Sequence, residues 1–289
     1  METAVLTGSD VMAYFKGEKK QNNGQLSARQ VIIPVLIFLI IQLSVTLVIA
    51  FLCGEGWLPE EEMSTTATAL SAVLGFAAVL ACDRRMAIHA LQRESILRTG
   101  RCTVMLIFLC LLLAVCLNIV LNVLILSSGV QKIDPLYQQA AQTFAEGSLP
   151  LQILAYGILV PVAEESLFRG IVYRFFKSRF NGSIKRHAAA ILLTSLVFAV
   201  YHGNLTQGLY TFLLSLAFCF ATDCGGLIMS VALHIGLNLT SLIGAHVPRY
   251  QALLTSPSAG WPIVLIAAVL AAGLVYLIRK ISKSQNHII

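Results

Sequence analysis

The chain contains long stretches without a single Asp, Glu, Lys or Arg, and these limit its possible folds more than any other feature. A helix needs about 20 apolar residues to cross the hydrocarbon core of a bilayer. The stretch at 187–222 is too long for one crossing, and His202-Gly203-Asn204 divides it in two. We therefore predict eight transmembrane helices in one all-α bundle around a polar intramembrane cavity. The stretches are 30–54, 63–82, 102–131, 147–163 (its helix continuing to about 176), 187–222, 225–244 and 261–278.

The composition is that of a polytopic membrane protein, since 57% of the residues are apolar and only 12% are charged. An ordinary soluble domain is excluded. The net charge of +6 would suggest a nucleic-acid partner in a soluble chain, but membrane topology explains it better, and we expect no nucleic acid. Residues 1–30 are polar and predict a mobile cytoplasmic tail, with no signal peptide. Residues 31–289 are expected to form a single transmembrane domain, with the lipid bilayer as its surroundings.

The basic residues predict the orientation of the chain in the membrane. They gather in the amino-terminal tail, in residues 83–101, in residues 174–186 and after residue 278, which together hold all but three of the 20 Lys and Arg residues. With eight spans these four segments lie on one side, and short cytoplasmic loops are enriched in Lys and Arg. Both termini are therefore predicted to be cytoplasmic, in the plasma membrane of a bacterium. The loop 83–101 is either a solvated basic loop or an amphipathic helix at the membrane surface.

Three short motifs place ionisable side chains inside these apolar stretches. They are Glu164-Glu165-Ser-Leu-Phe-Arg169, Phe198-Ala-Val-Tyr-His202 and His234-Ile-Gly-Leu-Asn238. Ionisable groups are costly in hydrocarbon and persist there mainly when they face the bundle interior and serve a function. Carboxylates, imidazoles, an arginine and a carboxamide are together the components of a hydrolytic site.

The two adjacent carboxylates are expected to have different roles. Glu165 and Arg169 are four residues apart on one helical face, in the order that favours an ion pair. Glu164 is turned about 100° away and has no such local partner, which suits a general acid or base. A structural salt-bridge cluster between helices would explain Glu165 and Arg169 but would leave Glu164 without a purpose.

Each histidine taken alone is more typical of a satisfied core residue than of a catalytic one. Their depth makes a shared site plausible: at 1.5 Å per residue, Glu164, His234 and Asn238 come out roughly 13–20 Å from the cytoplasmic ends of their helices. His202 is deeper, at about 21 Å, and needs helix tilt or a short fifth helix to reach the others. We therefore expect the motifs to meet in one cavity enclosed by the fourth to seventh spans.

The three motifs, in this order on separate spans, closely resemble the CPBP family of intramembrane proteases over residues 149–245. That family includes the type II CAAX prenyl endopeptidases and bacterial proteins linked to bacteriocin processing and self-immunity. The resemblance implies that Glu164 and His202 hold and activate a water, and that His234 and Asn238 donate hydrogen bonds to the developing oxyanion. It also implies that Glu165, Arg169 and Phe198 support the site. The first three spans carry no matching motif.

The residue types leave a zinc-dependent mechanism open. Glu164, His202 and His234 could bind zinc with water as the fourth ligand, although the sequence has no His-Glu-x-x-His motif and no Cys near the site. The resemblance favours a metal-free, glutamic mechanism over a metalloendopeptidase, so we expect no cofactor.

The sequence favours a membrane-embedded endopeptidase that cleaves a membrane-associated or lipid-modified peptide or protein. The alternative is a non-enzymatic membrane protein, namely an immunity or scaffold factor, or a small transporter. A transporter would usually carry inverted repeats, and a scaffold has no need of Glu164. Whether the substrate is prenylated, and the oligomeric state, do not follow from the sequence.

Other polar residues in the spans are given structural roles. Asn118 and Asn122 share one helical face and are expected to make interhelical hydrogen bonds. Asp223 is expected to cap the seventh span. Gly157 is expected to permit close helix packing.

Overall fold

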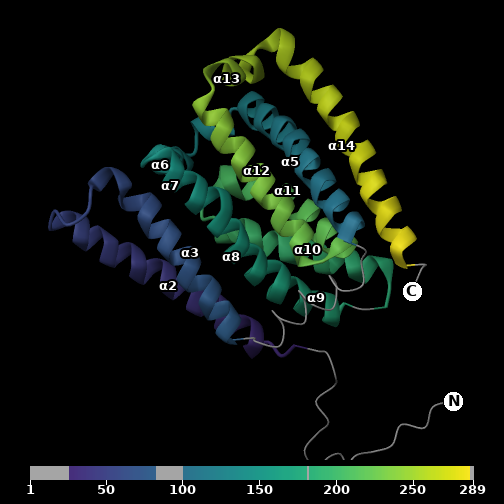
Figure 1. Cartoon of the computed structure of the whole chain (residues 1–289), viewed down its shortest axis with the longest axis horizontal. Helices are drawn as coiled ribbons and strands as arrows, with labels where there is room; N and C mark the ends of the chain where they lie inside the picture. The colour runs from purple at the N-terminus through teal and green to yellow at the C-terminus, as the bar shows by residue number, and fades with distance from the viewer. Residues whose placement is uncertain (1–25, 83–99, 181, 287–289) are drawn as a thin grey trace, which may run out of the picture.

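The computed structural model describes residues 26–82, 100–180 and 182–286, and these residues form an α-helical bundle without a strand (Figure 1). Within them, eight helices are long and apolar enough to cross a membrane. The prediction of an eight-helix, multi-pass membrane protein is confirmed. The amino-terminal tail and most of the basic loop 83–101 lie outside the described residues. The regular spans are α2 (Arg29–Gly54), α3 (Met63–Cys82), α5 (Gly100–Ser128), α10 (Ile184–Tyr201), α11 (Leu205–Gly225), α12 (Leu227–His246) and α14 (Pro257–Asn286).

The fourth span is built from five consecutive segments rather than one regular α-helix. Two π-helical segments, η3 and η4, flank the short α-helix α8, which carries Glu164 and Glu165. π-Helical turns inside α-helices are rare and occur frequently at functional sites. The sequence motif does not predict these π-helical segments. The segments are α7 (Leu149–Gln152), η3 (Ile153–Leu159), α8 (Val160–Leu167), η4 (Phe168–Tyr173) and α9 (Arg174–Arg179).

A proline explains why the first π segment needs a partner from another helix. The N–H of Val160 bonds to the carbonyl of Ala155, five residues back, and the next residue, Pro161, has no N–H to donate. The carbonyl of Tyr156 is therefore left without a backbone donor from the following turn. The side-chain Nδ2 of Asn238 donates to it at 2.8 Å, which ties α12 to the fourth span.

The centre of the bundle is α5, which packs between α12 and α14 (Figure 1). Its side chains at Leu106, Cys110, Leu113 and Ala114 are buried. The hairpin of α2 and α3 lies at one edge of the bundle, and many of the large apolar side chains of α2 point outward. Such broad apolar exposure is typical of a surface that faces lipid.

Short helices close the loops at the two ends of the bundle. The Nη2 of Arg179 at the end of α9 donates to the carbonyl of Leu26 (3.4 Å), so the start of α2 and the end of the fourth span share one end. Figure 1 shows the last turns of α14 near that same end. The opposite end carries η1 (Glu60–Glu62), η2 (Val130–Lys132), α6 (Pro135–Ala145) and α13 (Pro248–Thr255).

The structural roles given to the other polar residues hold only in part. Asn118 bonds across helices, from Nδ2 to the Ser241 Oγ at 2.6 Å, but Asn122 donates only to Asn118 on its own helix. Asp223 does not cap the seventh span: α11 continues through it to Gly225, and its carboxylate points sideways to Lys177, His187 and Tyr173.

A close helix approach at Gly157 is confirmed. A Cβ at this position would lie 2.6 Å from a Leu239 methyl carbon of α12. This contact and the bond from Asn238 to Tyr156 join the same two elements, η3 and α12. The irregular part of the fourth span is therefore held against the helix that carries the second histidine.

Asp134 connects two elements at the end of the bundle opposite the basic loops. One carboxylate oxygen caps α6 by accepting from the N–H of Tyr137 (3.2 Å), and the other accepts from the N–H of Thr206 at the start of α11 (2.7 Å). The donated bond from Thr206 is the main cause that holds the pKa of the Asp134 carboxyl below its ordinary value. Asp134 thereby fixes the turn that follows His202.

Asp134→Ala should lower the thermal unfolding midpoint of the purified protein near neutral pH, because it leaves two N–H groups without an acceptor. Since the folded-state pKa is lowered, the stabilisation is present above the unfolded-state value of about 3.9 and disappears as the pH falls through the lower folded-state value. Unfolding of wild type and variant should therefore converge only in strong acid. A difference that stays constant with pH would contradict this account.

Candidate active site

The buried centre of the site is the ion pair between Arg169 and Glu165. Nη1 of Arg169 lies 2.8 Å from Oε1 of Glu165, and both side chains are fully buried. The predicted i,i+4 pair is therefore present, although Arg169 lies in the π-helical segment η4. A buried charge is tolerated when it is paired and hydrogen-bonded.

Two aromatic rings and a hydroxyl complete the surroundings of the guanidinium. Arg169 lies over the rings of Phe198 and Phe218, 4.5 and 4.7 Å from their centres, and cation–π attraction is strongest at such desolvated positions. Nη2 donates to Ser215 Oγ of α11 at 2.6 Å. Arg169 thus joins the fourth, fifth and sixth spans, and Phe198 contacts the arginine as a supporting residue would.

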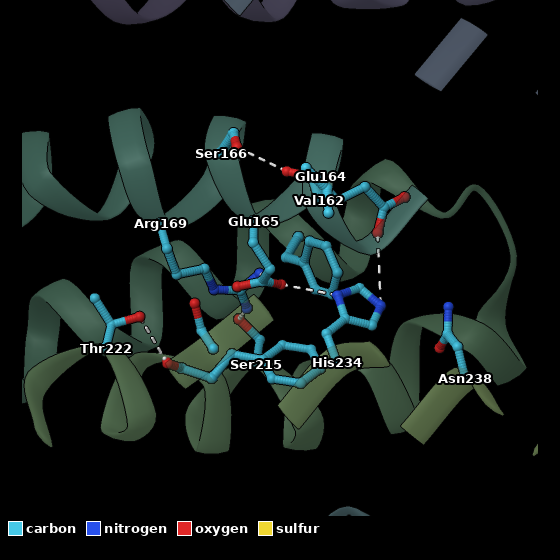
Figure 2. Close-up of polar contacts among 12 residues, drawn as sticks. Val162, Glu164, Glu165, Ser166, Arg169, Ser215, Thr222, His234 and Asn238 are labelled. Carbon is cyan, nitrogen blue, oxygen red and sulfur yellow. Dashed lines mark hydrogen bonds and ion pairs between the residues drawn. The ribbon is translucent and has the colours of Figure 1, made fainter. Parts of the chain in front are cut away.

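His234 is held between the two carboxylates of the motif. Its Nδ1 lies 2.9 Å from Oε1 of Glu165, and its Nε2 lies 3.9 Å from Oε2 of Glu164 (Figure 2). The ring also stacks on Phe218, with centres 4.6 Å apart. Nδ1 donates to the Glu165 carboxylate, which leaves Nε2 as the ring nitrogen that faces Glu164.

Glu164 has the different surroundings that the sequence predicts. Its separation from His234 Nε2 is too long for a direct hydrogen bond, and the carboxylate lines a cavity of about 90 Å³. That volume is ample for water, since about 10–15 Å³ is enough to hold one molecule. The polar wall is formed by Gln42, Thr46, Thr68, Ser71 and Tyr201, and the apolar wall by Phe38, Ala72, Val160 and Ala163.

The position of this cavity corrects one expectation. We expected the fourth to seventh spans to enclose it, but its walls come from α2, α3, α8 and α10. The reason is that the inner side of α8 facing α11 and α12 is filled by the Arg169 ion pair, the two phenylalanines and His234. Glu164, turned away from Glu165, opens toward the first two spans instead.

His202 and Asn238 lie near this centre but are engaged with backbone. Nδ1 of His202 bonds to the Phe198 carbonyl at 2.8 Å, and the ring packs edge-on against Phe198 and Tyr201. Asn238 lies one turn beyond His234 on α12 (Figure 2) and uses one Nδ2 hydrogen for Tyr156. The structure therefore brings Glu164, Glu165, Arg169 and His234 into direct contact or close approach, and places His202 and Asn238 beside them.

A catalytic zinc ion requires three protein ligands that converge on one point. Both histidines donate through Nδ1, as zinc-binding histidines commonly do. However, no group of three His, Cys, Asp or Glu side chains in the described part of the chain is gathered closely enough to hold a metal. The residues as arranged in the described part of the chain do not fit a zinc ion.

Sequence reasoning missed four residues that build the site: Ser215, Phe218, Tyr201 and Gln42. Phe218 and Ser215 lie on α11, which carries no motif, and only their contacts with Arg169 identify them. Tyr201 stands inside the second motif, directly before His202. Gln42 was detectable as an uncharged polar residue within the first span, where a polar side chain needs a partner.

Arg169→Met should destabilise the protein by roughly 3–5 kcal/mol, the usual cost of leaving one member of a buried ion pair uncompensated. Lys177→Met is the matched control: it removes one partner of the half-exposed Lys177–Asp223 pair and should cost less than about 1 kcal/mol. Denaturant titration of the detergent-solubilised variants measures both. Adding Glu165→Gln to Arg169→Met should recover part of the loss, and equal costs for Arg169→Met and Lys177→Met would refute the pairing.

Known proteins resemble the segment that builds this site. Residues 146–240 match the family model described as type II CAAX prenyl endopeptidase Rce1-like. An uncharacterised 24.3 kDa protein of Escherichia coli is 36% identical over 112 residues, which is 35% of this chain. The aligned part spans 48% of that relative's length. No solved structure matches the chain. The matched residues 146–240 contain all three motifs, so this segment of the chain is similar to the Rce1-like type II CAAX prenyl endopeptidases, the resemblance that the motifs predicted.

Proposed function

We propose that this protein is an intramembrane endopeptidase that hydrolyses a peptide bond of a membrane-associated peptide or protein. The observation that carries the proposal is the pairing of two unlike carboxylates around His234. Glu165 is neutralised by Arg169 and orients the imidazole, whereas Glu164 faces a polar cavity within the membrane-spanning bundle. The family match at residues 146–240 supports the same reaction class.

In the proposed mechanism Glu164 is the general base. It takes a proton from a water molecule while the water oxygen attacks the peptide carbonyl carbon, and the carbonyl oxygen becomes an oxyanion. The protonated Glu164 then gives the proton to the leaving nitrogen as the C–N bond breaks, releasing a carboxylic acid and an amine. His202 is proposed to bind the same water molecule as Glu164, as the family resemblance implies.

His234 and Asn238 are proposed to stabilise the oxyanion. Glu165 holds Nδ1 of His234, so Nε2 is the ring nitrogen proposed to donate to the developing charge. Asn238 has two hydrogens on Nδ2, and one is used for Tyr156, so the second is the donor in this role. The proposal thus gives Asn238 a structural bond and a catalytic one.

The substrate class follows from the position of Glu164. A carboxylate within a lipid-embedded bundle meets a peptide that enters from the membrane or is anchored to it, so the proposed substrate is membrane-associated or lipid-modified. Both termini and the basic loops are proposed to be cytoplasmic, on the strength of the Lys and Arg distribution. The non-enzymatic alternative, an immunity or scaffold factor, does not require the Glu164 carboxylate that lines the cavity.

Glu164→Gln should abolish cleavage of a farnesylated peptide ending in Cys-aliphatic-aliphatic-X, while expression and thermal stability stay close to wild type. The amide keeps the shape but cannot accept the proton, and loss of general base catalysis costs about 10²–10⁴ in rate. Cleavage is followed by mass spectrometry with protein reconstituted in liposomes. A Glu164→Gln variant that retained full turnover would refute the assignment of the base.

Metal content separates the glutamic mechanism from the zinc-dependent alternative. Purified protein should contain no stoichiometric zinc, and chelators should leave cleavage intact. His234→Ala and Asn238→Ala should each lower turnover by about 10²–10³ with little change in KM, because oxyanion donors act in the transition state. One zinc per chain, lost on changing His202 or His234, would overturn the metal-free mechanism while the protease proposal stands.

A further inference from the structure

A hydrogen bond connects the first span to the motif-bearing part of the bundle. Nε2 of Gln42 on α2 donates to the Tyr201 hydroxyl oxygen on α10 at 2.6 Å, across 159 residues of sequence. Gln42 lies outside the residues 146–240 that match the family model. A polar bond between two membrane-spanning helices ties them together, but here it also reaches the cavity that Glu164 lines.

The hydrogens carried by Gln42 and Tyr201 determine which way a further hydrogen bond from Tyr201 can run. A tyrosine hydroxyl has one hydrogen and can accept as well as donate, whereas an amide NH₂ group only donates. Because the Tyr201 oxygen accepts from Gln42, its hydrogen is available to another acceptor. Tyr201 and Glu164 line the same cavity, and Glu164 is the one carboxylate among its lining residues.

The Tyr201 ring is held in place by aromatic packing. Its centre lies 5.1 Å from that of Phe168 and 6.3 Å from that of Phe38. Phe38 precedes Gln42 by one helical turn and is buried against α3, where a Cβ at Gly75 would come within 2.5 Å of the Phe38 ring. The absence of a side chain at Gly75 therefore lets α2 approach closely enough to present Gln42 to Tyr201.

We propose that Gln42 and Tyr201 form a hydrogen-bond relay that positions the Glu164 carboxylate over the cavity. In this relay Gln42 donates to Tyr201 and Tyr201 donates to Glu164. Both are positioning residues that act through Glu164, and the proposal rests on the proposed function of Glu164 as the base. It assigns the first span a part in the reaction that the three motifs do not contain.

The relay predicts different outcomes for two substitutions of the same residue. Gln42→Leu removes the donor and leaves the Tyr201 hydroxyl less constrained. Gln42→Glu introduces a carboxylate that competes with Glu164 for the single tyrosine hydrogen, so it should be the more harmful change. If Gln42 only filled space between helices, Gln42→Leu, which keeps most of the side-chain volume, would leave kcat unchanged.

The kinetic test uses the reconstituted protein and the farnesylated peptide. Tyr201→Phe should lower kcat by about 10–100-fold with little change in KM, since a misplaced catalytic group costs up to about 10²-fold. In the Tyr201→Phe background, Gln42→Leu should change kcat by less than about 2-fold, because coupled residues are not additive. Tyr276→Phe, which removes an exposed hydroxyl on α14, is the matched control and should leave kcat unchanged.

A second measurement tests the relay without relying on activity. Thermal unfolding midpoints of single, double and triple variants should show that Gln42→Leu and Glu164→Gln are coupled when Tyr201 is present. The two should become additive in Tyr201→Phe. Additive shifts in the Tyr201 background, or kcat losses of Gln42→Leu and Tyr201→Phe that multiply, would overturn the relay. If the wild-type protein did not cleave the peptide, the proposed function would fail for that substrate, and the unfolding cycle would still decide the relay.

Discussion

The arrangement of the rest of the site depends on Arg169, a fully buried arginine in a membrane-spanning helix. The guanidinium cannot lose its charge, so its neighbours must stabilise it, and the structure supplies a carboxylate, a hydroxyl and two aromatic faces. Those neighbours come from three spans, which fixes the spacing of the fourth, fifth and sixth helices. Glu165 is thereby committed to the ion pair, and the same Oε1 atom holds Nδ1 of His234.

The commitment of Glu165 gives Glu164 its separate role. Two adjacent carboxylates with the same surroundings would repel each other and share their protons. Here Arg169 compensates only the charge of Glu165, while Glu164 is turned by about 100° on the helix toward a polar cavity. The difference between the two residues is therefore a consequence of helical geometry and of one cation. It requires no special property of either glutamate.

The sequence predicted what depends on local spacing and failed where distant segments meet. The Glu165–Arg169 pair follows from an i,i+4 spacing, and the eight spans follow from the length of the charge-free stretches. The π-helical segments depend on Pro161 and on a carboxamide from α12, which are 77 residues apart in the sequence numbering. Gln42 and Tyr201 meet only because α2 packs at Gly75, and no periodicity in either span encodes that contact. The prediction that Asp223 caps the seventh span was wrong because α11 continues through Asp223 to Gly225.

The division of the site between two parts of the chain limits how much the family match explains. Residues 146–240 supply the ion pair, the histidines and Glu164, which are the groups that have roles in the proposed mechanism. Most of the polar wall of the cavity, at Gln42, Thr46, Thr68 and Ser71, belongs to α2 and α3, outside the matched residues. A substrate that reaches Glu164 through this cavity contacts that wall. The groups of the proposed chemistry therefore lie in the matched segment, whereas the first two spans of this chain supply most of the polar wall that a substrate in the cavity would meet.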